Sequence, residues 1–553
     1  MQSSSALRCW FGLMCVGAIL MLLAEFVPDG TSESALADES GQASARPSNQ
    51  SNGVQARSSV SKPAAPPSPP VEALVSRSDP LAIFEAGVPG LDAAKDVALD
   101  VLARDVITRS GYLTHTAGPG YDTPWLRDSF AWGMIPSDSY SELAPYSASE
   151  LRFWLGQQRP SGQWITNPQS GYYDETAIMI CASLDAYRLT GNRALLQASI
   201  AQLRKGWAWL RTNPPGVESA YLLWTPVQGP ATPLKRLPVS VDWADQIGRR
   251  DYAGQLNTLW YRATQSMAQI EAVLGNASEA AHYTAFAEHI KSDFNRLLWT
   301  QGPVYARNAP AVAPFGHYRS WYPGDRDYFE LDTNLQAVIY GLADSVQSQA
   351  ILGFVQANEA YLLGSENGNP PPAKSVYGQY APEDYAAIRS RIGDDKYQNA
   401  YWMPIGGLAA RAFWQAGRRD MVGRVMQGLS GAFYAGRPAT SAAEWYDASG
   451  QPNGSPAYEW SARSFLEALF RAYLGVDDDW SNPRAENLRV NPLFGGASGR
   501  IKHLGKIITV RTHGSGSYQT AVVDGATTVA SELIPEALLH DGTNIDLYLT
   551  GQN

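Results

Sequence analysis

The strongest constraint on the fold is a helical hydrophobic pattern that extends over most of the chain. Apolar residues recur at spacings of three and four, as they do on the buried face of an α-helix. The stretches that show this pattern best are 93–107, 175–190, 195–212, 255–274, 280–299, 331–343, 400–417 and 461–475. Pairs of such stretches recur roughly every 50 to 60 residues, which is typical of stacked helical hairpins. We therefore expect residues 78–480 to form a mainly α domain, an (α/α)6 toroid of helical hairpins.

The pattern changes near the C-terminus. In LRVNP, KIITVRTHG, YQTAVVD and NIDLYLT, apolar residues alternate with polar ones, and glycine and aspartate lie between the segments. A periodicity of two predicts short strands joined by turns. We expect residues 481–553 to form a small antiparallel β region, which is too short to be an enzyme by itself.

The N-terminal segment has the features of an export signal. Arg8 precedes an apolar run over residues 10–27, and the small residues Ala35 and Ala37 suit a signal peptidase that cleaves after Ala37. An uncleaved signal anchor is the alternative, because this run is barely long enough to cross a bilayer. We expect residues 1–37 to direct export to the periplasm, the cell envelope or the medium, with a membrane tether as the second possibility.

Composition and net charge indicate a disordered linker and argue against one class of partner. Residues 38–77 are rich in serine, proline and alanine, so they cannot bury enough apolar surface to fold and are predicted to be a disordered linker. The whole chain carries a formal net charge of -10. Nucleic-acid affinity rests on lysine and arginine, so this acidic balance argues against a nucleic-acid partner.

The cysteines predict neither a disulfide nor a metal centre. Cys9 and Cys15 fall in the targeting segment, which leaves Cys181 as the single thiol of the exported chain. Cys181 lies in the apolar stretch IMICASL, where a small buried hydrophobic residue is expected. The spacing of cysteine and histidine suggests no metal site, and no cofactor motif is present. We make no prediction of the oligomeric state.

Two aspartates precede the helix expected at residues 255–274. Asp242 and Asp245 flank Trp243, and an aromatic neighbour partly desolvates a carboxyl group, as a general acid requires. The other interpretation makes one of them a helix cap or an ion-pair partner of Arg249 or Arg250. The residues alone leave both interpretations open.

A second acidic segment lies before the last predicted helix, in SAAEWYDASGQPNGSPAYEWSARSFLEALFRA. Glu444 stands among small and aromatic residues, ahead of a glycine-rich turn. Glu459 directly precedes Trp460 and Ser461 at the expected helix start, where a carboxylate stabilises the helix dipole. Hydrolysis of a glycosidic bond needs two carboxyl groups, one to donate a proton and one to activate water or attack carbon.

Other segments combine aromatic and polar side chains as a sugar site requires, because sugars offer hydroxyl groups at the rim and C–H groups on the faces. In TPWLRDSFAW, Trp125 could stack on a ring while Arg127 and Asp128 hold hydroxyl groups, although a surface ion pair is the alternative. In GYYDETAIM, Asp174 is a candidate sugar-binding residue or a helix N-cap.

These blocks resemble, in order and spacing, those of the six-hairpin glycosidases, which include glucoamylases, glycogen-debranching α-1,6-glucosidases, trehalases and α-rhamnosidases. The block WADQIG is similar to the Trp-any-Asp block that carries the acid in the debranching enzymes, and Gly248 closes it. The resemblance implies that Asp245, rather than Asp242, is the general acid. It implies that Glu444, rather than Glu459, is the general base.

The same resemblance assigns substrate-binding roles. Trp125, Arg127 and Asp128 match the group that binds the terminal sugar, and Asp174 and Trp243 lie in matching blocks. The segment YQNAYWMPIGG is similar to a further block whose substrate-facing residues would be Gln398, Asn399 and Trp402. Two departures stand out: Met403 separates Trp402 from Pro404, and Ala244 and Asp245 occupy the places of paired glutamates in glucoamylases.

The resemblance therefore implies an exported glycoside hydrolase that acts on an oligosaccharide or polysaccharide, with a glucosidase or debranching-like activity favoured. Its reaction would be a single displacement with inversion, for which the two carboxyl groups lie about 6.5 to 9.5 Å apart. A polysaccharide lyase is the alternative enzyme class, with His317 and Tyr318 as candidate bases. A non-catalytic carbohydrate-binding envelope protein is the other alternative.

Overall fold

The structure is a computed structural model. It describes residues 84–130, 144–166, 173–212, 218–225, 242–244, 247, 249–364, 373–385, 396–435, 442–477 and 484–550. The predicted signal segment and linker lie outside these residues. Helices dominate from residue 89 to residue 474, and strands dominate from residue 484 to residue 550, so the chain is mainly α with small β-sheets.

One set of helices is buried on nearly every side. Neighbouring members pack against each other in the order α2, α5, α7, α9, α13 and α15, and α15 in turn contacts α2, so that the contacts close into a ring. These helices are α2 (Leu126–Phe130), α5 (Asp174–Thr190), α7 (Gly254–Leu274), α9 (Leu331–Ile339), α13 (Met403–Gln415) and α15 (Glu459–Leu474). A helix that is buried on all sides belongs in the core of a protein. Nearly every residue of α5 and α15 is buried, so both helices lie in the core.

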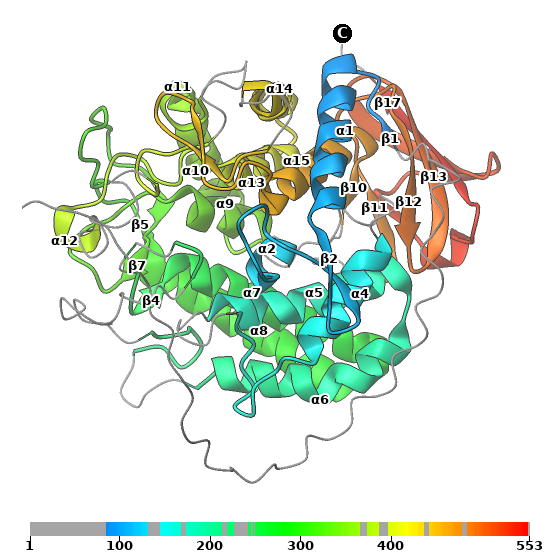
Figure 1. Cartoon of the computed structure of the whole chain (residues 1–553), viewed down its shortest axis with the longest axis horizontal. Helices are drawn as coiled ribbons and strands as arrows, with labels where there is room; N and C mark the ends of the chain where they lie inside the picture. The colour runs from blue at the N-terminus through cyan, green and yellow to red at the C-terminus, as the bar shows by residue number, and fades with distance from the viewer. Residues whose placement is uncertain are drawn as a thin grey trace, which may run out of the picture. The chain divides into compact units, whose positions relative to one another are not determined.

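A second set packs against this ring. Helix α8 lies along α7, α6 along α5 and α7, α14 along α13, and α1 along α15, as the ribbon in Figure 1 shows. In α6 the buried residues lie on one face, as expected for an outer amphipathic helix. The set consists of α1 (Pro89–Arg104), α4 (Ala144–Leu155), α6 (Arg193–Leu210), α8 (Ala277–Leu298), α10 (Ser345–Ala357) and α14 (Arg419–Ala435).

Short elements occupy the connections. The helical ones are α11 (Glu359–Leu362) and α12 (Pro382–Tyr385). Antiparallel ladders join β2 to β3, β4 to β7, β5 to β6 and β8 to β9. Their bounds are β2 (Val106–Arg109), β3 (Tyr112–His115), β4 (Tyr252–Ala253), β5 (Trp299–Thr300), β6 (His317–Tyr318), β7 (Trp321–Tyr322), β8 (Trp445–Tyr446) and β9 (Pro452–Asn453).

The largest sheet has the strand order β1-β12-β13-β17-β14-β15. Its strands are β1 (Phe84–Glu85), β12 (Ser498–His503), β13 (Lys506–Gly514), β14 (Ser517–Val523), β15 (Thr527–Val529) and β17 (Asn544–Thr550). The expectation of a purely antiparallel region is wrong in one place, because β13 and β17 pair in parallel. The reason is that β17 inserts between β13 and β14, which run in opposite directions on either side of it. A smaller sheet joins β10 (Val476–Asp477), β11 (Leu488–Val490) and β16 (Leu533–Ile534).

The β region contacts the end of an inner helix. The turn between β12 and β13 donates backbone N–H groups from Leu504 and Gly505 to the carbonyl oxygens of Arg188 and Leu189 in the last turn of α5. Strand β1 precedes α1 in the sequence and pairs with β12 of the C-terminal sheet. The helical region and the C-terminal sheet are therefore joined in two places, through β1 and through the last turn of α5.

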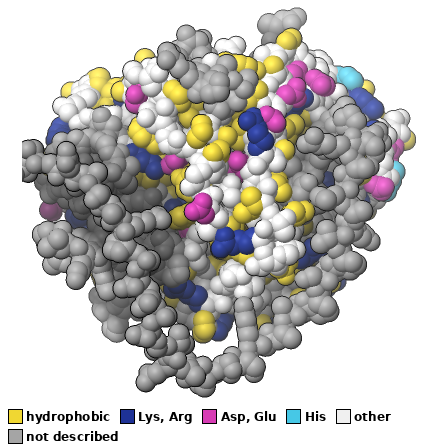
Figure 2. Space-filling model, in the orientation of Figure 1, with side chains coloured by type: hydrophobic (Ala, Val, Ile, Leu, Met, Phe, Trp, Pro, Cys, Tyr) yellow, Lys and Arg dark blue, Asp and Glu magenta, His cyan; other side chains and the backbone are white. Residues whose placement is uncertain are grey.

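Cys181 is buried within α5, as predicted for a small hydrophobic residue. Burial raises the pKa of its thiol to about 11. Among the described residues, none of the helices combines the length and apolar character needed to cross a bilayer. On the described part of the face in Figure 2, acidic, basic and hydrophobic side chains are intermixed.

Several buried carboxyl groups give the fold a predicted pH dependence. Burial raises the pKa of Asp105, Glu175 and Glu330 to about 7 in each case, and raises that of Glu459 well above its usual value. The folded state thus keeps protons that the unfolded chain releases near pH 4, so stability falls as the pH rises through about 7. Burial lowers the pKa of His503 to about 4, which acts in the opposite direction between pH 4 and 6.5.

Burial also lowers the pKa of His317. We therefore expect the melting temperature to fall between about pH 5 and pH 8, because these four carboxyl groups outnumber the two histidines. Scanning calorimetry across this range measures the effect. Each carboxyl group with a pKa near 7 contributes on the order of 3 kcal/mol if it acts alone. A Glu175→Gln variant, which mimics the protonated form, should show a weaker dependence on pH. A melting temperature that rises steadily from pH 5 to pH 8 would contradict the prediction.

Candidate active site

A pocket lies where the beginnings of α2, α13 and α15 meet. It has about 430 Å³ of empty space, including the part that is open to solvent. Its walls are Tyr121, Trp125, Arg127, Asp128, Trp243, Lys396, Tyr397, Trp402, Glu444, Tyr458 and Trp460. The segments that the sequence singled out for sugar binding and catalysis thus supply most of the lining.

Glu444 is the carboxylate that the sequence predicted as base, and it is held from both sides. It lies just before β8 and is only 6% exposed. Its Oε1 is 2.7 Å from the Lys396 ammonium group. Its Oε2 accepts hydrogen bonds from the Tyr121 hydroxyl at 3.1 Å and from the Ser455 N–H at 3.2 Å. The result is a fixed carboxylate in the pocket wall, with lone pairs still available to a water molecule.

The glycine-rich turn after Glu444 makes this position possible. Gly454 has φ +71°, a left-handed conformation that glycine adopts without strain. A Cβ atom on this residue would lie 2.5 Å from Glu444 Oε2 and 2.7 Å from Glu444 Cβ. The turn therefore needs glycine for its backbone and for its close approach to the carboxylate.

Arg127 and Asp128 present a cation and an anion to the same pocket. The Arg127 guanidinium forms a two-point pair with Asp174, with Nε to Oδ2 at 2.8 Å and Nη2 to Oδ1 at 3.1 Å. Asp128 accepts a short hydrogen bond from the Tyr458 hydroxyl. Asp174 is fully buried at the start of α5 and is not among the lining residues, so the structure places it behind Arg127.

Aromatic rings form the rest of the wall. Trp243 meets the rings of Trp402, Tyr397 and Trp460 edge to face, with centroid distances of 5.3, 5.4 and 5.8 Å. Tyr397 and Trp402 are stacked on each other. Trp125 contacts Tyr121 edge to face at 6.2 Å. Such a wall offers apolar faces to the C–H groups of a sugar, while the charged groups between the rings can bind hydroxyl groups.

The two aspartates beside Trp243 differ in what the structure describes. Asp245 and Gly248 lie outside the described residues, so the assignment of Asp245 as general acid stays a prediction. Asp242 is fully buried and accepts from Arg249 Nη1 at 2.9 Å and from the Ala244 N–H at 3.0 Å. This is the ion-pair interpretation that the sequence left open for one member of the pair.

Two further candidates lie beside the pocket rather than in its described lining. Gln398 is buried, and Asn399 accepts a hydrogen bond from Gln379 Nε2 at 2.8 Å. Their neighbour Trp402 does line the pocket, and its indole N–H donates to the Lys396 carbonyl at 2.8 Å. The insertion of Met403 does not remove Trp402 from the site.

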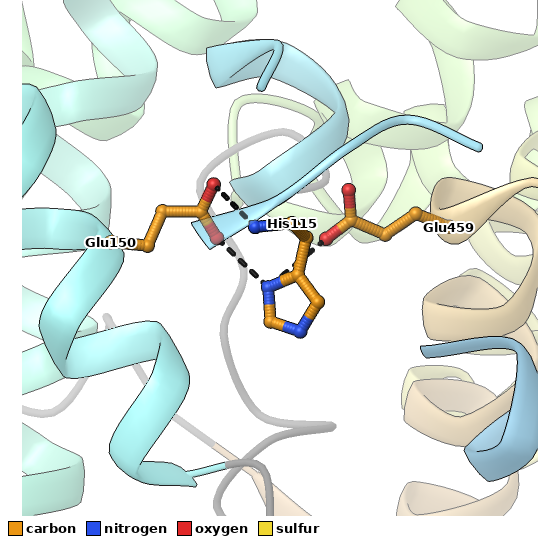
Figure 3. A group of neighbouring side chains, drawn as sticks. All are labelled: His115, Glu150 and Glu459. Atoms are coloured by element: carbon orange, nitrogen blue, oxygen red, sulfur yellow. Dashed lines mark hydrogen bonds and ion pairs between the residues drawn. The ribbon is translucent and has the colours of Figure 1, made fainter. Parts of the chain in front are cut away.

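Glu459, the alternative base, lies in a separate buried cluster, shown in Figure 3. His115 Nδ1 is 3.0 Å from Glu150 Oε2 and 3.7 Å from Glu459 Oε1. These three residues bring potential metal-ligand atoms within 4.8 Å of one another. However, Arg463 Nη2 lies 2.7 Å from Glu459 Oε1 and 3.3 Å from His115 Nδ1. The guanidinium already supplies the positive charge, so we interpret the group as an ion-pair cluster.

This cluster supports the pocket from behind. The Ser129 hydroxyl of α2 donates to Glu150 at 2.6 Å, which links α2 to the start of α15 through His115 and Glu459. Burial raises the pKa of Glu459 well above its usual value. Because Glu459 is not among the lining residues, its position is that of a packing residue.

The candidate lyase residues are also outside this lining. His317 and Tyr318 form β6 and are both fully buried. His317 Nδ1 lies 3.0 Å from the Phe315 carbonyl, and the Tyr318 hydroxyl donates to Asn295 at 2.7 Å. Neither side chain lines the pocket.

The lining includes five residues that were not predicted as site residues: Tyr121, Lys396, Tyr397, Tyr458 and Trp460. Four of them adjoin residues that the sequence did single out: Lys396 and Tyr397 precede Gln398, and Tyr458 and Trp460 flank Glu459. The partnership of Lys396 with Glu444 spans 48 residues of sequence and had no local signal.

Comparisons with known proteins support the fold. No family model and no curated protein matches this chain. A solved structure described as a sialidase matches over 84% of this chain and 40% of its own length, with a TM-score of 0.56 and 12% identity. A GH78 family rhamnosidase of Bacillus sp. GL1 matches over 78% and 41%, with a TM-score of 0.52 and 14% identity. The chain thus spans about two fifths of each structure, and at these identities it shares with them a fold that glycoside hydrolases use.

Proposed function

We propose that the chain is an inverting glycoside hydrolase, with Glu444 as general base and Asp245 as general acid. The observation that supports this most is the position of Glu444, a fixed carboxylate in an aromatic-walled pocket that also contains Arg127 and Asp128. The solved structures with the same fold are named as glycoside hydrolases, which agrees with the proposal.

The proposed reaction is a single displacement. Glu444 accepts a proton from a water molecule while the oxygen of that water attacks the anomeric carbon from one face of the sugar. The bond to the leaving oxygen breaks on the opposite face, and Asp245 gives that oxygen its proton. The sugar gains a hydroxyl group and the two carboxyl groups exchange their protonation states, which solvent restores.

We also propose that the helical region is an (α/α)6 toroid and that the chain is exported. The closed ring of inner helices, covered by the outer set, supports an (α/α)6 toroid with the β region at its C-terminal side. Export through residues 1–37, followed by a linker over residues 38–77, rests on the sequence alone.

The charges of the pocket favour a neutral sugar as substrate. Among the described lining residues, Arg127 and Lys396 are the basic side chains, and each is already in an ion pair, with Asp174 and Glu444 respectively. A substrate carboxylate would have to compete with these two carboxylates for its cation, and it would approach Glu444 and Asp128 at a cost in electrostatic energy. Neutral hexose units, as a glucosidase or debranching-like enzyme takes, bring no such charge.

A panel of substrates tests the proposal directly. The purified chain is incubated with α- and β-linked neutral oligosaccharides, sialosides and polyuronides, and proton NMR identifies the anomer released first. We expect turnover of a neutral glycoside with inverted configuration. Release of the retained anomer would contradict the inverting mechanism. Absorbance from an unsaturated uronate would point to a lyase, and saturable sugar binding without turnover would point to the non-catalytic alternative.

A further inference from the structure

Trp243 lies at the centre of the aromatic wall, and its polar edge needs a partner. Only 3% of the residue is exposed, so its indole N–H cannot rely on solvent. A buried donor without an acceptor costs about 1 to 3 kcal/mol. Trp243 Nε1 donates to Asp332 Oδ2 at 2.7 Å. Asp332 belongs to the first turn of α9 and does not line the pocket.

Asp332 is itself held in place. Its Oδ2 also accepts from Arg249 Nη2 at 2.8 Å, and its Oδ1 accepts from the Thr333 N–H at 2.6 Å. The residue is fully buried. With both oxygens fixed, the carboxylate can set the direction of the indole ring as well as satisfy its N–H group.

Arg249 connects this carboxylate to the backbone on both sides of Trp243. Besides Asp332, the guanidinium pairs with Asp242 at 2.9 Å and with Glu330 at 2.9 Å. Asp242 in turn accepts from the N–H of Ala244, so the residues before and after Trp243 belong to the same network. One guanidinium thus orients both the main chain around Trp243 and the acceptor of its side chain.

The network around Arg249 contains more carboxyl groups than basic groups. Glu330 Oε1 accepts from the Tyr380 hydroxyl at 2.6 Å. Three buried carboxyl groups, those of Asp242, Glu330 and Asp332, share the charge of Arg249. Burial raises the pKa of Glu330 to about 7, so this group can hold a proton near neutral pH and reduce the negative excess.

We infer that Asp332, held by Arg249, is a positioning residue that fixes the Trp243 ring and thereby sets the affinity of the pocket for a sugar. Asp332 acts through Trp243 and touches no substrate. The effect on sugar affinity rests on the proposed function, whereas the effect on the orientation of Trp243 does not.

The first test measures the indole group itself. The chain is labelled with ¹⁵N-tryptophan, and the Trp243 N–H resonance is assigned by its loss in Trp243→Phe. We expect Asp332→Asn to shift this resonance and to speed its exchange with solvent by about tenfold or more, because the amide has neither the charge nor both acceptor oxygens. Asp185→Asn is the matched control: Asp185 is a buried partner of Arg262 and Arg188, away from the pocket lining. It should leave the Trp243 resonance unchanged.

The second test measures sugar binding and turnover. For the best substrate of the panel, Asp332→Asn should raise KM about 10- to 100-fold and lower kcat much less, because a displaced wall loses contact with the bound ring. If Asp332 acts through Trp243, adding Asp332→Asn to Trp243→Phe should cause little further change. Additive losses in the double variant would mean that Asp332 has a general structural role, and would overturn the inference.

Two outcomes separate the failure of this inference from that of the proposed function. If no sugar is bound or cleaved, the proposed function fails, and the Trp243 resonance still decides the link to Asp332. If the resonance is the same in Asp332→Asn and wild type, the inference fails even for an active glycosidase. Should Asp332→Asn not fold, Arg249→Lys, which keeps a cation but not its planar fork, should shift the same resonance.

Discussion

Replacing Glu444 by glutamine is expected to lower kcat by about 10²- to 10⁴-fold, because the amide cannot take a proton from the attacking water. The side chain keeps its size, and its amide oxygen can still accept from Tyr121 and Ser455, while the amide nitrogen faces Lys396 and the ion pair is lost. Steady-state rates on the best substrate measure the loss, and far-UV circular dichroism checks that the fold is intact. Asp245→Asn is expected to cause a comparable loss on substrates with poor leaving groups.

Glu459→Gln is the matched control for this experiment. Glu459 is the other glutamate of the same segment, but it is buried beside Arg463 and does not line the pocket. The amide keeps the size of the side chain, and its oxygen can still accept a hydrogen bond from Arg463 Nε, which lies 2.8 Å from Glu459 Oε1. We expect its activity to stay within a few-fold of wild type. A folded Glu444→Gln variant with normal kcat would remove Glu444 from the mechanism, and a folded but inactive Glu459→Gln would transfer the role.

The largest effect on stability is expected from Arg127→Met. Arg127 and Asp174 are both buried, and the methionine would leave the Asp174 carboxylate without its two-point partner. Breaking a buried pair in this way typically costs about 3 to 5 kcal/mol. Urea unfolding measured at constant pH gives the difference. We also expect the loss to be smaller in the double variant Arg127→Met, Asp174→Asn, where no charge is left unpaired.

Arg104→Met provides the comparison for Arg127→Met. Arg104 pairs with Asp100 on the surface of α1, and the two side chains are 53% and 62% exposed. Solvent screens such a pair, so the same substitution should cost less than about 1 kcal/mol. Equal losses in the two variants would mean that the cost comes from the methionine, not from the buried charge.

The sequence predicted the inner helices well because their pattern is strong and local. The stretch 255–274 corresponds to α7 (Gly254–Leu274), and 175–190 corresponds to α5 (Asp174–Thr190). Helices α2, α4, α10 and α14 were not among the predicted stretches; α14 includes three glycines, which weaken a helical pattern. The parallel pairing of β13 and β17 could not be predicted, because it depends on which distant strand inserts beside β13.

The lining of the pocket was predictable where one short segment combines aromatic and charged residues, as for Trp125, Arg127 and Asp128. It was less predictable where function depends on partners far apart in the chain. Asp174 was expected to bind sugar, but it holds Arg127 from behind. No sequence motif pointed to Lys396, because its ion pair with Glu444 forms only when the segment before α13 lies opposite Glu444 in the fold.

The contact between the β12–β13 turn and the last turn of α5 bears on how this protein can be divided. Helix α5 begins with Asp174 behind the pocket. At its other end, its carbonyl groups accept hydrogen bonds from the N–H groups of Leu504 and Gly505. The β region therefore caps the C-terminal end of a helix of the inner ring. Expression of residues 78–480 alone would remove the partners of those two carbonyl groups and of the edge of β1 that pairs with β12. The boundary between the helical and the alternating sequence patterns is therefore a poor place to truncate the chain.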